Sequence, residues 1–386
     1  MKKPAFINGV IIQHIANRRP NSLWDLVRLS SKERLTKATV LVLLAWLPAG
    51  ALSLLGGMES LVSFLTDIAT QSRLLIAIPV LVLAYPFARE RIEHLQNQFL
   101  LAGVVPDDEQ ARFQSIREFC NALRTSALGD VLMALLAFLS ILGLLAYVNP
   151  STLRPWLVGR APFDLSVAGT WFAFVSLPIL AYLLFSWMWN HMVWAWFLRK
   201  VSRLPLTLTP AHPDQVGGLA FLEGSLKAYY AFGLVVGLIA AGGAANRIVH
   251  HGRSLTEFKG LALFVIAFVL LVAVGPLAVF ARTLAGTKFR GICDYGPLAS
   301  AVGQRFYWKW VRTREAWTEE ALTAQDFSAM TDLYQVVGNV YAMKVLPIGL
   351  TSVTRLLAYS VAPAIPVALA AVPFDIIVST LVKHLL

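Results

Sequence analysis

Charged residues are scarce in this chain of 386 residues. Asp, Glu, Lys and Arg together make up 14% of the sequence, whereas hydrophobic residues make up 57% and the mean hydropathy is +0.64. A soluble domain typically has about 25% charged and 45–50% apolar residues. Because the core of a globule of this size cannot bury such an apolar excess, the composition argues against a soluble enzyme and indicates a membrane protein.

Cysteine is nearly absent, since the chain contains only Cys120 and Cys293. Two distant thiols provide neither a disulfide framework nor the ligand spacing of a zinc site. Signatures of catalysis are missing too: there is no Gly-x-Ser-x-Gly, no His-Glu-x-x-His, no clustered histidine boxes and no Gly-rich phosphate loop. The sequence therefore predicts no catalytic residues, no metal site and no cofactor, and favours a protein that is not an enzyme.

Long stretches without acidic or basic side chains are present instead, and a membrane span needs about 20 such residues. The second stretch is short and contains Pro79 and Pro86. The fourth is longer than a bilayer core, so it must tilt, kink at Pro178 or project beyond the membrane. The sequence predicts an all-α polytopic membrane protein with seven transmembrane helices, at about 38–57, 74–88, 131–148, 165–198, 228–246, 260–281 and 356–382.

The distribution of basic residues predicts the topology. With the N-terminus inside, 26 of the 33 Lys and Arg residues fall on the cytoplasmic side, and removing the second span would destroy this bias. We therefore expect the N-terminus inside and the C-terminus outside. The net charge of +11 then indicates contact with the lipid bilayer and with anionic headgroups at the inner face, and no nucleic acid.

Outside the spans, the chain predicts a modest cytoplasmic part. Residues 1–37 have the pattern of an amphipathic segment on the inner membrane surface, ahead of a transmembrane domain over 38–386. Segments 89–126, 199–227 and 282–355 are predicted to continue the membrane helices as a small cytosolic helical bundle, the first of them broken near Pro106.

The last span contains the strongest candidates for a pathway. Pro363, Pro366 and Pro373 must kink or break it, and Asp375 is an ionisable group at membrane depth. Broken helices occur where the freed backbone groups face protein or a water-filled cavity, as they do in ion pathways. The alternative is that Asp375 lies near the outer interface, where it is paired or hydrated.

The fifth span contains a row of small residues that begins with Gly233 and Gly237 and continues at the same spacing with alanines. Small residues four positions apart let two helix backbones approach closely. Helix packing and the lining of a narrow pathway are both compatible with this spacing.

The most distinctive local sequence is the HPD loop, residues 208–222, which runs Leu-Thr-Pro-Ala-His-Pro-Asp-Gln-Val-Gly-Gly-Leu-Ala-Phe-Leu. In the structural interpretation the prolines fix the path of the chain, His212 or Asp214 caps a helix, and Gly217 and Gly218 allow close backbone packing. In the functional interpretation the same four residues bind an ion or a lipid headgroup.

The loop from His212 to Phe221 resembles the HPDxxGGLxF loop of a family of uncharacterised bacterial polytopic membrane proteins. The resemblance extends to residues 294–299 and 324–333. It implies a bacterial inner-membrane location and supplies no catalytic residues. In topology alone, the chain is similar to insect odorant and gustatory receptor channels, whose characteristic motif in the last helix is absent here.

Three hypotheses follow for the function. The first is a channel or transporter for a small ion, with its pathway near the proline-broken last helix and with a homo-oligomer as a suitable assembly. The alternative is a sensor or assembly partner that does not transport and acts through its cytosolic helical bundle. The third is a lipid-modifying membrane enzyme that uses the HPD loop.

Overall fold

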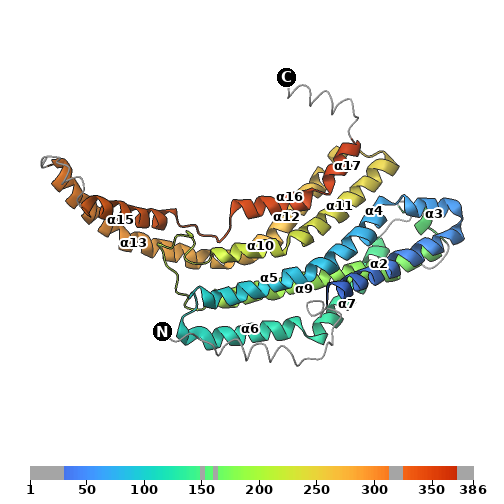
Figure 1. Ribbon diagram of the computed structural model, residues 1–386. Helices are drawn as coiled ribbons and strands as arrows, with labels where there is room; N and C mark the ends of the chain where they lie inside the picture. The colour runs from blue at the N-terminus through green and yellow to red at the C-terminus, as the bar shows by residue number, and fades with distance from the viewer. Residues whose placement is uncertain (1–29, 148–152, 160–163, 313–324, 372–386) are drawn as a thin grey trace, which may run out of the picture.

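The computed structural model describes residues 30–147, 153–159, 164–312 and 325–371. All regular structure in these ranges is helical, apart from one isolated bridge between Val158 and Leu165. This confirms the predicted all-α class. The helices lie side by side in an elongated bundle (Figure 1).

Six helices are long and apolar enough to cross a membrane, and a seventh candidate is a pair of helices bent at a break. The prediction of seven spans therefore holds if the bent pair counts as one span. The continuous candidates are Ser31–Gly56, Ile68–Leu101, Ala127–Tyr147, Val167–Val201, Ala220–His251 and Leu255–Arg312.

The first span begins earlier than its hydrophobic run. Helix α2 (Ser31–Ser53) starts after Ser30, whose hydroxyl accepts from the Glu33 backbone N–H while the Glu33 carboxylate accepts from the Ser30 backbone N–H. This reciprocal cap fixes the start of the helix seven residues before the predicted boundary at residue 38. Most of the predicted amphipathic segment, residues 1–29, lies outside the described residues.

Prolines do not divide the second and fourth spans. In the second, a π-helical turn (Ser72–Ala77) leads into α5 (Ile78–Leu101) immediately before Pro79. In the fourth, short α8 (Val167–Trp171) and a π-helical turn (Phe172–Ser176) lead into α9 (Leu177–Val201), with Pro178 in its first turn. A wider turn before the proline relieves the clash of its ring with the preceding turn, so each helix stays continuous.

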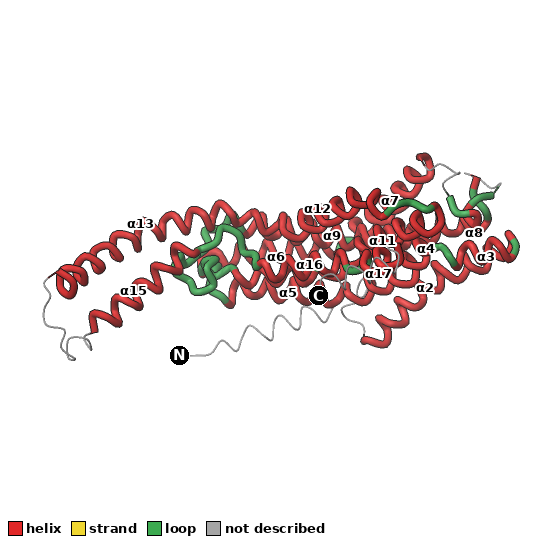
Figure 2. The backbone as a smooth tube through the Cα atoms, turned by 90° about the horizontal axis from the view of Figure 1, so that it is seen from above, coloured by secondary structure: helices red, strands yellow, loops and turns green. Residues whose placement is uncertain are grey.

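Several helices continue beyond their apolar stretches at the end predicted to be cytoplasmic. Helix α5 is followed there by α6 (Gln110–Arg124), which packs against α9, and the break between α5 and α6 contains Pro106 as predicted. Helix α12 (Lys259–Val274) continues through a 3₁₀ segment into α13 (Ala281–Phe306), which pairs with α15 (Gln325–Ala342). We call α13, its continuation Tyr307–Arg312 and α15 the arm, which projects from the bundle in Figure 2.

An aromatic cluster joins these extensions to one another. Phe99 of α5 lies within 5.0–6.3 Å, ring centroid to ring centroid, of Phe113, Phe197, Phe221 and Phe280. The five rings come from α5, α6, α9, the HPD loop and the segment before α13, and Phe99 is fully buried. Edge-to-face and tilted aromatic contacts of this kind give this end of the bundle a core of its own.

The opposite end contains two short helices that the sequence does not predict, α3 (Met58–Leu65) and α4 (Ile68–Gln71). Asp67 lies between them, 2% exposed, and accepts hydrogen bonds from the Trp156 indole N–H at 2.9 Å and the Asn246 amide at 3.0 Å. Its carboxylate also accepts from the Thr70 backbone N–H. These bonds tie α4, α11 (Tyr230–His251) and the segment before α8 together, because a buried carboxylate must be hydrogen-bonded.

Candidate functional site

The last span is broken at Pro363. Helix α16 (Leu350–Val361) and helix α17 (Ala364–Ala371) meet at an angle of 50°, and Pro363 occupies the turn between them. Proline lacks an N–H and cannot donate to the carbonyl of Tyr359 four residues earlier. Pro366 lies in the first turn of α17, where no donor is needed, and the predicted pathway residues Pro373 and Asp375 lie outside the described residues.

Gly233 and Gly237 of α11 pack directly against α16. A Cβ added at Gly237 would overlap the backbone carbonyl oxygen of Ser360, and one at Gly233 would come within 2.6 Å of the Ser360 hydroxyl. The hydroxyl in turn donates to the Leu356 carbonyl at 2.9 Å. Close packing of two helices accounts for both glycines, and a pathway at this point would require α11 and α16 to separate.

The start of α16 is held by an acidic residue. Glu223 ends a 3₁₀ turn (Ala220–Glu223) before α10 (Gly224–Ala228), and its carboxylate accepts a short hydrogen bond from the Ser352 hydroxyl. The same carboxylate lies beside Gly349, where a side chain would collide with it. A negative charge at a helix N-terminus is stabilised by the helix dipole, so Glu223 links the HPD loop to the last span.

In the HPD loop, the Asp214 carboxylate is surrounded by donors. It accepts hydrogen bonds at 2.9–3.1 Å from the backbone N–H groups of Val216, Gly218 and Ala220. The Nδ1 atom of His212 also lies close to this carboxylate, 2.7 Å from Asp214 Oδ1. Asp214 therefore organises the loop from within, and the 3₁₀ turn that follows (Ala220–Glu223) has Leu219 at its N-cap position without a side-chain cap.

These hydrogen bonds affect the pKa of the Asp214 carboxyl. Burial alone would raise the pKa of this carboxyl, but the backbone donors and His212 together outweigh burial and hold the pKa below its usual value. The carboxylate is thereby kept charged, and its oxygens are used within the loop.

The two glycines of the loop allow a path that other residues would strain. Gly217 and Gly218 have φ values of +68° and +97°, and Gln215 also has a positive φ, of +58°. The Gln215 carbonyl accepts from the Lys344 backbone N–H at 2.7 Å, which ties the loop to the segment between α15 and α16. Within this arrangement the four predicted residues of the loop lie together, and they join the arm to the bundle.

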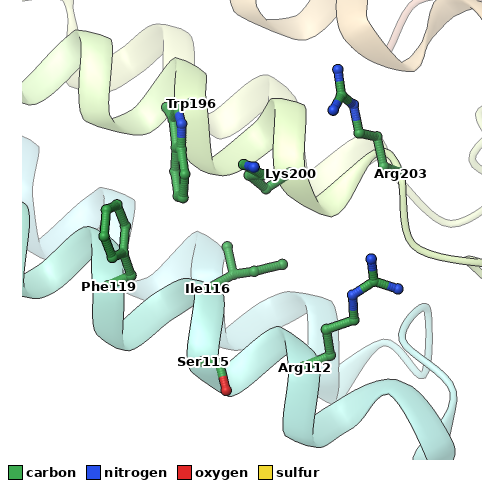
Figure 3. A pocket seen from close by; sticks show the side chains of 7 residues that line it. All are labelled: Arg112, Ser115, Ile116, Phe119, Trp196, Lys200 and Arg203. Atoms are coloured by element: carbon green, nitrogen blue, oxygen red, sulfur yellow. The ribbon is translucent and has the colours of Figure 1, made fainter.

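A groove on the surface lies between α6 and the end of α9 (Figure 3). Its volume is about 330 Å³, and Arg112, Lys200 and Arg203 line it. The Lys200 ammonium stands 5.0 Å from the ring centroid of Trp196. Basic and aromatic side chains at a predicted cytoplasmic surface form the type of site that anionic headgroups occupy.

One cluster of polar residues is not predicted from the sequence, and we call it the arginine pocket. It lies where α5, α6, α9 and the start of α11 meet, and its polar lining residues are Tyr85, Arg89, Arg124, Asn190 and Tyr229. The side chain of Arg124 is only 3% exposed. Arg124 shortly precedes the apolar run that begins near residue 131, and this neighbourhood is the sequence signal for its burial.

The two cysteines differ in environment. Cys120 is buried in α6, and burial raises the pKa of its thiol to about 11. Cys293 is exposed on α13. A thiol with a raised pKa is a poor nucleophile, because the thiolate is the reactive form.

Comparison of the chain with protein-family models, with curated proteins and with solved structures found no match. The site is therefore interpreted from its own geometry. Within the described residues, His, Cys, Asp and Glu side chains do not gather in groups of three or more that would hold a metal ion.

Proposed function

We propose that the protein is a channel or transporter for a small ion in a bacterial inner membrane, with its pathway beside the bent last helix. The observation that carries this proposal is the 50° break between α16 and α17 at Pro363. A helix broken within a membrane leaves backbone groups without intrahelical partners, and lipid cannot satisfy them. Such breaks are tolerated where the freed groups face protein or water, as at ion sites in transporters.

The surroundings of the break support a pathway there. The backbone carbonyl of Tyr359 receives no hydrogen bond from Pro363, which has no N–H. The ring of Tyr359 stacks on the ring of Tyr230, with 5.1 Å between the ring centroids. Helix α16 is held at its start by Glu223 and along its length by Gly237, so the bend has a fixed position. The basic groove of Arg112 and Lys200 suits anionic headgroups and supports the proposed orientation, with this end in the cytoplasm.

Replacing Pro363 with alanine is expected to reduce ion flux at least tenfold, because an N–H at this position can restore the helical bond and straighten the bend. The measurement is flux of halide and of alkali cations through the purified protein in liposomes. Pro366→Ala is the matched control and should retain flux, since this proline lies in the first turn of α17. Asp375→Asn tests the acidic residue predicted to lie on the pathway. Absence of flux for every ion through the wild-type protein would refute the proposal.

The arm supports a second candidate function, in which the protein transports no ion and acts as an assembly partner of another protein. Large apolar side chains stay exposed on both of its helices: Phe289 is 68% exposed, Trp308 58%, Tyr334 48% and Tyr341 54%. Exposed aromatic residues outside the membrane mark surfaces that bind other proteins. In this proposal the arm contacts another protein. If that protein is a second copy of this chain, the assembly is a homo-oligomer.

Replacing Trp308 and Tyr334 with serine is expected to abolish this association while the monomer stays folded, because about half of each residue is already exposed. Native mass spectrometry and co-purification measure the outcome. Phe264→Ser, on the exposed face of α12 within the predicted membrane span, is the control that leaves the arm intact. An assembly unaffected by the double substitution would contradict a role for the arm.

A further inference from the structure

The arginine pocket contains more positive than negative charge. Arg89 and Arg124 are its two cations, and the nearest carboxylate is Glu93, which lies 2.9 Å from Arg89 Nε. The distance from Glu93 to Arg124 Nη1 is 4.0 Å. One exposed carboxylate is thus shared by two guanidinium groups, and its close contact is with Arg89.

Two of the three guanidinium nitrogens of Arg124 lack a hydrogen-bond acceptor. Its Nε and Nη1 atoms are buried and have no hydrogen-bond partner, although the side chain is 97% buried and carries a full charge. Placing such a group in an apolar environment is unfavourable unless a counter-charge accepts its hydrogen bonds. The structure therefore contains a buried guanidinium group, with two nitrogens that lack acceptors, among the residues that line a small cavity.

The other polar groups of the pocket cannot supply the missing charge. Tyr85 and Asn190 are hydrogen-bonded to each other, and Tyr229 is a neutral phenol beside Arg124. The carboxylate of Asp130, on α7 (Ala127–Tyr147), is hydrogen-bonded to Tyr182 and is not part of the lining. The accessible lining is mainly apolar, and phenol and amide groups among its few polar groups can donate to an anion.

We propose that the arginine pocket binds a small inorganic anion of the halide class, with chloride as the physiological example. The cavity has a volume of about 30 Å³, which holds one or two water-sized species and is too small for a phosphate headgroup with its ester arms. The anion accepts from Arg124 and completes the charge balance of the pocket. This proposal goes beyond transport, because the anion can stabilise the junction of α5, α6 and α9 whether or not ions cross the membrane.

The test compares thermal unfolding of the purified protein in chloride and in gluconate at equal ionic strength. Chloride is expected to raise the Tm of the wild-type protein saturably, by roughly 2–4 °C, because an anion that binds only the native state stabilises it. Arg124→Gln should abolish this dependence and should unfold no earlier than the wild type in gluconate, since it removes an uncompensated buried charge.

Arg91→Gln is the matched control, because Arg91 is exposed on α5, one of the helices that form the pocket, and is not part of its lining. It should keep the full response to chloride. Should Arg124→Gln fail to fold, bromide soaked into crystals of the wild-type protein gives an independent readout, and an anomalous peak beside Arg124 is expected. Equal chloride dependence in Arg124→Gln and wild type, a pocket without bromide, or stabilisation by phosphatidylglycerol vesicles alone would each overturn the proposal. None of these readouts depends on flux, so they are separate from the test of transport.

Discussion

Replacing Gly237 with alanine is expected to destabilise the protein by about 3 kcal/mol, the upper part of the range for overpacked cores. The added Cβ would overlap the backbone carbonyl oxygen of Ser360, which cannot move away as a flexible side chain can. The whole of α16 would have to shift away from α11. The Tm in detergent measures the loss, which should appear as an earlier unfolding transition.

Gly243→Ala provides the control on the same helix. No atom lies within 4 Å of a Cβ built at Gly243, so this substitution should leave stability unchanged or slightly improved through its higher helix propensity. Because Gly237 positions the last span, Gly237→Ala is also expected to alter any activity that depends on the bend at Pro363. Equal Tm values for the two alanine variants would show that α11 and α16 do not pack as described.

Asp214→Ala is the second substitution with a large expected effect, a loss of at least about 3 kcal/mol in the free energy of unfolding. It leaves the backbone N–H groups of Val216, Gly218 and Ala220 without their acceptor. Hydrogen bonds to a charged acceptor are worth about 1.5–3 kcal/mol each and are not additive, so the estimate lies well below their sum. Thermal unfolding measures the loss, and proteolysis at the loop reports its release.

The stabilisation by Asp214 should depend on pH. The native state holds its pKa below the usual value, so the unfolded chain binds the proton more readily. The contribution is therefore fully present above the unfolded pKa of about 3.9 and is lost as the pH falls through the lower native pKa. The wild-type protein should lose stability on acidification below pH 4 more steeply than Asp214→Ala. Asp332→Ala, at an exposed position of α15, should behave as the wild type does.

The HPD loop shows which structural features can be predicted from local sequence. Its prolines, glycines and acidic residue predict a structured turn, and the structure gives Gly217 and Gly218 the positive φ values that only glycine adopts readily. Whether Asp214 stabilises the loop itself or binds a ligand depends on the groups that surround its carboxylate. That information lies in the backbone conformation of the following six residues, where three N–H groups converge on one carboxylate.

The arginine pocket illustrates what local sequence does not contain. Arg124 has the same sequence character as Arg112 on the same helix, yet one is nearly fully buried and the other is exposed. The difference arises because α6 ends against α5 and α9, which bring Tyr85 and Asn190 to Arg124. Similarly, the burial of Asp67 depends on Trp156 and Asn246, which are distant from it along the chain.

The amino-acid sequence by itself determined the all-helical class, the apolar segments and the break in the last of them. These features are local, because a bilayer requires about 20 consecutive apolar residues and because proline removes a donor wherever it occurs. Only the tertiary structure decided that Gly237 packs on Ser360 and that Arg124 lies buried with two nitrogens that lack an acceptor. Contacts between segments distant in the chain determine burial, and burial determines which charges require a partner.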